Sequence, residues 1–458
     1  MPDLTPRRRL LILAVCCTSL LIAGLDATAV NVALPAVGRD LDLPVSGLQW
    51  IIDGYTLPIA GFLMLAGSTA DRIGRRRVFQ TGLALFTICS LACALAPDLG
   101  WLVACRVGQG LGASMLNPVA LSIVTTTFTD SRERTRAIGV WSGAIGLALA
   151  LGPVVGGLLV GVAGWRSVFW INVPVGIAAI ALTALFVPES RAATARRPDP
   201  VGQLLVVAAL VAITWAIIEG SREGYGDPLI ILLFAIGAGA GVALVRYENR
   251  RDQPLIDPSF FRSVSFSGAV VTAVAAFIGL SGFLFLNTLY LQDVRGYDAL
   301  HAGLLTLPMA AATALASPIS GRITARYGPR LPLVAAGLLV VVAAVLLTTS
   351  TQTTPVAVLI VGYVLFGTGF GLVNTPITNT AVSGMPRAQA GVSAAIASTG
   401  RQIGNTLGVA ILGSIVAAHL PAPVGWWILA GCGALVATLG VLTTTRRVVP
   451  AMQLASQP

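Results

Sequence analysis

The sequence contains no lysine and only two histidines, and charged residues of all kinds make up 10% of its 458 positions. A water-soluble chain carries about 25% charged residues, so too little polar surface is present to cover a soluble exterior. Without lysine, the phosphate-binding loop ending in Gly-Lys-Ser/Thr is excluded, and no nucleotide or other cofactor is expected. There are only two histidines, His301 and His419, and both lie near predicted outer ends of spans, so no histidine metal site is expected.

Cysteine is scarce as well, and all six cysteines fall inside apolar runs where they act as small core residues. No pair occupies a probable outer loop, so we predict neither a disulfide framework nor a zinc site. The residues are Cys16, Cys17, Cys89, Cys93, Cys105 and Cys432.

Apolar residues make up 55% of the chain, and the mean hydropathy is +0.85. A window of about 19 residues predicts fourteen membrane spans. The first continues past Asp26 and Asn31 without a small-residue cleavage site, so it is not interpreted as a secretion signal. The spans lie near 10–33, 48–69, 78–96, 99–124, 137–161, 167–187, 201–219, 228–246, 265–290, 301–320, 331–349, 356–377, 391–417 and 424–443.

Arginine is distributed very unevenly among the predicted loops. With both termini inside, the inner loops hold 23 arginines and the outer loops hold four. Positive residues are retained on the cytoplasmic side, so this distribution predicts cytoplasmic N- and C-termini and an even number of spans. The net charge of +10 therefore reflects membrane orientation, and no nucleic-acid partner is expected.

Internal repeats divide the chain into two related halves. Gly139, Gly152 and Gly156 recur as Gly391, Gly404 and Gly408, and Gly-x-Gly-x-Gly triplets begin at Gly108 and Gly367. Duplicated halves are typical of secondary transporters. We predict an all-α polytopic protein with an N-terminal six-helix bundle in 1–190, two inserted transmembrane helices with linkers in 191–262, a C-terminal six-helix bundle in 263–445 and a cytoplasmic tail in 446–458.

Charged residues within predicted spans are candidate functional groups, because charge inside a bilayer is expensive. Asp26, Asp53, Arg106 and Arg401 meet this criterion. A desolvated carboxylate can hold a proton until a cationic substrate competes for it. The alternative is that Asp26 and Arg106 form a fixed ion pair that only holds helices together. Polar or aromatic side chains predicted to line a cavity are Asn31, Trp50, Tyr55, Asn117, Asn374, Arg401, Gln402 and Asn405.

Two glycine-rich segments complete the candidate sites. The loop after the second span contains Gly67, Asp71, Arg72, Gly74 and Arg75, and we interpret it as a cytoplasmic latch, although arginines here also serve orientation. The fifth span contains small residues that allow close helix packing and a proline that allows a kink. These residues are Gly152, Pro153, Gly156 and Gly157.

These motifs resemble the signatures of the major facilitator superfamily. The Asp71-Arg-Ile-Gly-Arg-Arg loop, Arg106 with Gly110, and the Gly152-Pro153 segment carry the resemblance, and the last is similar to its antiporter motif. Three further segments look like the fourteen-span drug:proton antiporter branch: Leu25–Pro35, Trp165–Gly176 and Tyr290–Gly296.

The resemblance implies a major facilitator fold of fourteen helices in a bacterial plasma membrane. It implies that Asp26 couples protons to drug, that Arg106 assists the proton relay, that Asp53 has a less general role, and that Asp71 acts as the latch. The sequence departs from the pattern in having no acidic residue in spans ten to fourteen, which argues against dicationic substrates.

We therefore expect a monomeric, proton-driven exporter of lipophilic, cationic drugs or antibiotics, whose partners are the lipid bilayer, a small-molecule substrate and protons. Abundant arginine, alanine and glycine, with no lysine, indicate a GC-rich bacterial genome. Exporters of this kind in such bacteria often serve antibiotic self-resistance, which is the role we expect. A proton-coupled importer or uniporter on the same fold is the first alternative. A membrane-embedded enzyme would need clustered His, Cys or acidic residues, and a sensor would need a soluble domain.

Overall fold

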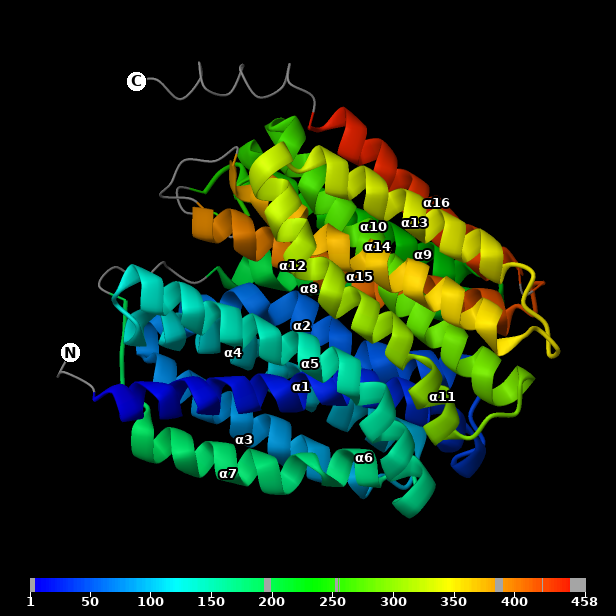
Figure 1. Cartoon of the computed structure of the whole chain (residues 1–458), viewed down its shortest axis with the longest axis horizontal. Coiled ribbons are helices and arrows are strands. Elements are labelled where there is room, and N and C mark those ends of the chain that lie inside the picture. The colour runs from blue at the N-terminus through cyan, green and yellow to red at the C-terminus, as the bar shows by residue number, and fades with distance from the viewer. Residues whose placement is uncertain are drawn as a thin grey trace. The chain divides into compact units, whose positions relative to one another are not determined.

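Figure 1 presents the computed structural model, which describes residues 5–192, 199–251, 254, 256–383, 390–421 and 423–444. Within those residues every regular element is a helix, so the predicted all-α fold is confirmed. The predicted cytoplasmic tail at 446–458 lies outside the described residues. The predicted domain boundaries stay predictions.

The helices follow the predicted spans closely, with ends shifted by a few residues. In the first half they are α1 Pro6–Asp40, α2 Val45–Ile73, α3 Arg75–Ala94, α4 Leu99–Thr127, α5 Ser131–Ala163, α6 Ser167–Trp170 and α7 Asn172–Phe186. After these come α8 Pro200–Glu223, α9 Pro228–Glu248, η1 Pro258–Arg262, α10 Val264–Leu289, η2 Tyr290–Val294, α11 Ala299–Leu305, α12 Leu307–Tyr327, α13 Arg330–Leu347, α14 Val356–Ser383, α15 Ala390–Ala417 and α16 Pro423–Leu442.

Thirteen helical stretches of the described chain are long and apolar enough to cross a membrane. The remaining predicted span, 391–417, is also helical and corresponds to α15 of 28 residues. Arg401, Gln402 and Asn405 lower the hydropathy of α15, which explains why it does not meet the same apolar threshold. These polar side chains make α15 the most unusual of the predicted spans.

Two predicted spans are interrupted by a single non-helical residue. The span at 167–187 divides at Ile171 into α6 and α7, and the span at 301–320 divides at Thr306 into α11 and α12. Pro174 and Pro308 lie just after these breaks, and proline cannot donate the backbone hydrogen bond that would continue the preceding turn. The prolines therefore account for both interruptions.

The chain forms two compact units. The first contains residues 1–207 together with 298–304, and the second contains 208–297 together with 305–458. The first unit thus holds α1 to α7, the beginning of α8 and most of α11. The second holds the rest of α8, α9, α10 and α12 to α16.

Matching glycines pair the corresponding helices of each unit. In the first unit, a Cβ added to Gly152 or Gly156 of α5 would collide with Thr28 or Ala29 of α1. In the second unit, a Cβ on Gly404 or Gly408 of α15 would collide with the backbone of α10. Small residues permit such close helix approach. The glycine spacing recognised in the sequence therefore reflects the same helix pair, built once in each unit.

The glycine triplets also have matching roles in the two units. A Cβ on Gly110 of α4 would lie 2.3 Å from the carbonyl oxygen of Tyr55 in α2, while one on Gly112 would lie 2.8 Å from that of Gly82 in α3. In the second unit, Gly367 of α14 approaches α12 and Gly369 approaches α13 in the same way. The triplets therefore hold α4 and α14 each between two neighbours.

We expect Gly156→Ala to destabilise the protein, because the added methyl group would lie 2.8 Å from Ala29 of α1. Overpacking of this kind costs about 1–3 kcal/mol, so the midpoint of thermal unfolding of the purified protein should fall. The matched control is Gly161→Ala in the same helix, where a Cβ would meet nothing within 4 Å. That variant should unfold at the same or a higher temperature, since alanine favours a helix; equal losses in both would contradict the packing argument.

Candidate functional site

A buried ion pair lies in the first unit between α1 and α4. Nη1 of Arg106 is 2.5 Å from Oδ2 of Asp26, and each residue is 1% exposed. Burying two charges is costly unless they are paired and their remaining polar atoms are hydrogen-bonded. The surroundings of the pair therefore decide whether it is stable.

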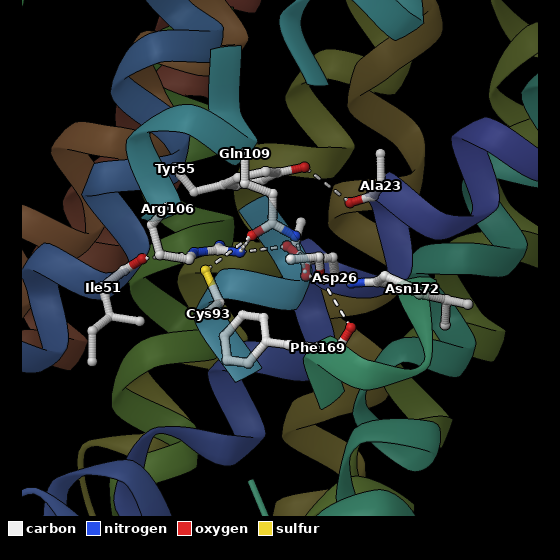
Figure 2. Close-up of polar contacts among 12 residues, drawn as sticks. Ala23, Asp26, Ile51, Tyr55, Cys93, Arg106, Gln109, Phe169 and Asn172 are labelled. Carbon is white, nitrogen blue, oxygen red and sulfur yellow. Dashed lines mark hydrogen bonds and ion pairs between the residues drawn. The ribbon is translucent and has the colours of Figure 1, made fainter. Parts of the chain in front are cut away.

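Two amide side chains satisfy the second carboxylate oxygen, as Figure 2 shows. Nε2 of Gln109 and Nδ2 of Asn172 each donate to Oδ1 of Asp26 at 2.9 Å. Oε1 of Gln109 in turn accepts from Nη1 of Arg106 at 2.7 Å. Both oxygens of the Asp26 side chain thus accept hydrogen bonds, from one guanidinium and two amides contributed by α4 and α7.

The network continues from Asn172 into α3 and α6. Nδ2 of Asn172 also donates to Oγ of Ser90 at 3.0 Å, and that hydroxyl donates to the carbonyl oxygen of Phe169 at 3.0 Å. Close by, Sγ of Cys93 lies 3.8 Å from Oε1 of Gln109. Four helices, α1, α3, α4 and α7, therefore contribute side chains to one polar cluster (Figure 2).

Arg106 is fixed from the side of α2 as well. Its Nε donates to the carbonyl oxygen of Ile51 at 3.1 Å, and its guanidinium lies 4.2 Å from the centre of the Tyr55 ring. The Tyr55 hydroxyl reaches α1, where it donates to the carbonyl oxygen of Ala23 at 3.2 Å (Figure 2). A desolvated cation–π contact is worth about 2 kcal/mol. These contacts therefore hold the Arg106 guanidinium in a single orientation.

Asp53 of α2 presents the opposite situation. Its side chain is 0% exposed, and Oγ1 of Thr56 donates to Oδ1 at 3.0 Å. Among the described residues, Oδ2 has no hydrogen-bond partner. Asp53 is thus a buried acid that forms no ion pair with any residue the structure describes. A carboxyl group in such a place is suited to carry a proton.

The structure brings some predicted site residues together and leaves others apart. Asp26, Arg106 and Tyr55 form one cluster, whereas Asp53 accepts a hydrogen bond from Thr56 instead. Gln109, Asn172 and Ser90 were not predicted as members. A usable signal existed for Gln109, because it follows Arg106 by three residues and so shares its helix face.

Of the other side chains predicted to line a cavity, Asn31 is buried and donates to the carbonyl oxygen of Ala27 at 2.9 Å. Trp50 and Asn117 are partly exposed. In the second unit, the polar groups lie on α14 and α15, all partly exposed: Asn374, Arg401, Gln402 and Asn405. Throughout the described chain, no three His, Cys, Asp or Glu side chains are grouped so that they could hold a metal ion.

The predicted latch is tied to the end of α7. Nη2 of Arg75 lies 2.9 Å from Oδ1 of Asp71, and Gly74 between α2 and α3 has a φ of 123°. The backbone N–H of Arg76 donates to Oε1 of Glu189 at 3.1 Å, and the carbonyl oxygen of Asp71 accepts from the N–H of Ala192. Glu189 was missed by the sequence analysis because it lies more than one hundred residues away along the chain.

Gly67 and Arg72 complete the predicted latch on α2. A Cβ on Gly67 would make an ordinary 3.8 Å contact with Pro118 of α4, and Arg72 is exposed. The predicted latch is thus a local ion pair between Asp71 and Arg75, joined to the segment after α7 by backbone and carboxylate hydrogen bonds.

The antiporter motif residues divide between two faces of α5. Gly152 and Gly156 face α1, whereas Pro153 and Gly157 face α11. A Cβ on Gly157 would lie 2.3 Å from the carbonyl oxygen of Ala299, and one on Gly303 would lie 2.3 Å from that of Pro153. The predicted close packing by small residues is present on both faces.

Comparison with known proteins adds independent information. The sequence profile of the Major Facilitator Superfamily matches residues 16–409. The chain is 39% identical to the multidrug resistance protein Stp of Mycobacterium tuberculosis, over 91% of this chain and 77% of that protein. It is 35% identical to the methylenomycin A resistance protein of Streptomyces coelicolor, over 87% and 84% of the two chains. It is 36% identical to a puromycin resistance protein of Streptomyces alboniger, over 90% and 82%.

We expect the Asp26–Arg106 pair to show strong coupling in a double-mutant cycle. Arg106→Gln alone leaves a buried carboxylate without its cation, which costs about 3–5 kcal/mol. Asp26→Asn alone leaves the guanidinium without its anion and should cost a similar amount. The double variant should lose at least about 1 kcal/mol less than the sum of the two. Unfolding of the purified protein provides the measurement, and additive losses would contradict the ion pair.

We expect Gly74→Ala to loosen the attachment of Glu189, because the backbone is strained for alanine at this φ and the new Cβ would lie 2.5 Å from Oε1 of Glu189. Strain of this kind costs about 1–3 kcal/mol. A glutamate-specific protease should then cleave after Glu189 faster in inside-out vesicles. Gly67→Ala is the matched control, since its Cβ would make an ordinary 3.8 Å contact; unchanged cleavage in Gly74→Ala would exclude the attachment.

Proposed function

Since this chain belongs to the Major Facilitator Superfamily, we propose that it is a proton-driven antiporter that exports lipophilic drugs or antibiotics by alternating access. The family assignment makes it a multi-pass membrane protein. Its relatives carry names of multidrug, methylenomycin A and puromycin resistance, which supports drug export. Two buried carboxylates, Asp26 and Asp53, support the proton coupling.

The observation that carries the proposal is the difference between Asp26 and Asp53. Asp26 accepts from Arg106, Gln109 and Asn172, so its charge is compensated. Asp53 has one hydroxyl donor and no cation among the described residues. A charge left uncompensated in a low-dielectric interior is disfavoured. Asp53 in this state therefore carries the transported proton, on Oδ2.

The exchange then follows from competition for one carboxylate. Deprotonated Asp53 attracts the cationic group of a lipophilic substrate, and the returning proton neutralises Asp53 and releases that substrate. Asp26 supplies a second step: its protonation would remove the charge that holds Arg106. Once freed from Asp26, the Arg106 guanidinium would take another hydrogen-bond partner, and the contact between α1 and α4 would change. A helix contact with two discrete arrangements is what a transporter needs to alternate between two states.

The remaining expectations belong to the same proposal. The protein acts as a monomer in a bacterial plasma membrane, with both termini in the cytoplasm. The distribution of arginine among the loops supports this orientation. The Asp71–Arg75 pair then lies at the cytoplasmic face, where a latch can bias one state over the other.

We expect Asp53→Asn to abolish both proton-driven transport and exchange of a cationic substrate. In everted vesicles, accumulation of the fluorescent cation ethidium should be lost in this variant and in wild type treated with an uncoupler. Exchange of labelled for unlabelled ethidium without a proton gradient should continue in the uncoupled wild type and be lost in the variant, because the neutral amide mimics the protonated carboxyl group, which releases the cation.

The matched control is Asp42→Asn in the exposed loop after α1, at a residue whose φ of 50° asparagine also tolerates. This control should transport normally. If Asp53→Asn accumulates ethidium at the wild-type rate while Asp26→Asn does not, the proton resides on Asp26 and the assignment to Asp53 is wrong.

A further inference from the structure

Arg401 of α15 is an arginine inside a predicted membrane span that lacks the compensation given to Arg106. The side chain is partly exposed, and Nη1 donates to Oγ1 of Thr378 on α14 at a long 3.3 Å. No carboxylate forms an ion pair with it among the residues that the structure describes. A single neutral hydroxyl is a weak partner for a guanidinium, which has five donors.

The part of the chain around Arg401 supplies no acid for that role. Asp298 is the last acidic residue of the chain, so residues 299–458 contain no carboxylate side chain at all. The helices packed against α15 include α10, α14 and α16, and none of them contains Asp or Glu. On α8, which reaches α15 through Ile217, Glu219 lies 3.3 Å from Arg222. Arg401 therefore carries a positive charge that no carboxylate among the described residues of its unit neutralises.

Polar groups surround this charge on two neighbouring helices. Gln402 and Asn405 follow Arg401 within one turn, and Nδ2 of Asn405 donates to Oε1 of Gln402 at 3.3 Å. The hydroxyl of Thr378 donates to the carbonyl oxygen of Asn374 at 3.1 Å. All four of these side chains are partly exposed, as Arg401 is. The cluster is rich in N–H donors, and its longer hydrogen bonds leave donors available to a ligand.

A packing role alone does not account for these residues. An arginine used only to fill space within a membrane span would cost less as a leucine or methionine, because unpaired charge inside a membrane is expensive. In the first unit, Asp26 compensates the charge of Arg106, and two amides hydrogen-bond to Asp26. Near Arg401 the amides of Gln402 and Asn405 are present, but no described carboxylate pairs with the guanidinium.

We propose that Arg401, with Thr378, Gln402 and Asn405, forms a binding site for the anionic group of a lipophilic substrate, a carboxylate or a phenolate. The planar guanidinium binds such groups through two parallel N–H···O bonds. This inference rests on the proposed function, export of lipophilic molecules, and extends its substrate class from cations to lipophilic acids.

The test compares two probes with the same skeleton. 1-Pyrenebutyrate carries a carboxylate, and 1-pyrenebutanol carries a neutral hydroxyl in its place. Binding to purified full-length protein in lipid nanodiscs is followed by energy transfer from tryptophan to pyrene, with no proton gradient. Wild type should bind the acid more tightly than the alcohol. Arg401→Gln should weaken binding of the acid by at least about tenfold, because a charge-assisted hydrogen bond is lost, and leave binding of the alcohol unchanged.

Two further variants keep the result interpretable. Arg401→Lys retains the charge and should restore part of the preference for the acid, whereas a purely structural arginine would not distinguish the probes at all. Asp42→Asn in the exposed loop after α1 should leave binding of both probes unchanged, since Asp42 is not part of the proposed site. The assay measures binding alone and uses no proton gradient. Failure of the proton-coupling proposal would thus leave this assay intact.

Equal loss of acid and alcohol binding in Arg401→Gln would overturn the anion site and make Arg401 a packing residue. Unchanged acid binding in that variant would overturn it too. The predicted result is a selective loss of the acid with normal binding of the alcohol, which also demonstrates that the variant is folded.

Discussion

The buried pair of Asp26 and Arg106 is the interaction on which the first unit depends. Two charges removed from water are tolerated only where every remaining polar atom is satisfied, and here Gln109 and Asn172 meet that condition. These side chains come from α1, α4 and α7, so the pair can form only where the three helices approach closely. Gly110 lets α4 approach α2 as well, where Ile51 and Tyr55 contact Arg106, because any side chain at Gly110 would collide with the backbone of α2. The packing glycines and the electrostatics are therefore parts of one arrangement.

Much of the fold could be predicted because backbone polar groups inside a membrane must be hydrogen-bonded within the chain. A long apolar run therefore predicts a transmembrane helix. The repeated glycine spacing also identified corresponding helices, since α5 and α15 use it against α1 and α10. Asp26 and Arg106 stood out as charges in apolar runs. The amides of Gln109 and Asn172 did not, because their importance depends on which helix faces meet. The attachment of Glu189 to the loop at Gly74 depends on tertiary contact in the same way.

The two units share a scaffold and differ in their electrostatics. Glycines hold α4 and α14 between equivalent neighbours, so duplication preserved the close backbone contacts. The carboxylates were not preserved: Asp26 and Asp53 belong to the first unit, and no acid follows Asp298. Packing constrains the backbone at many positions, whereas a charge needs only one local partner. After duplication, the two halves were therefore free to acquire different charged side chains.

The network around Asp26 also limits how the sequence can change over evolution. Any single replacement of Asp26, Arg106, Gln109 or Asn172 leaves a buried polar atom without its partner, so only coordinated changes preserve stability. Such compound changes are rare in a population under drug selection. Adaptation to a new compound will therefore proceed through partly exposed positions outside the network, where one substitution changes recognition and the protein still folds.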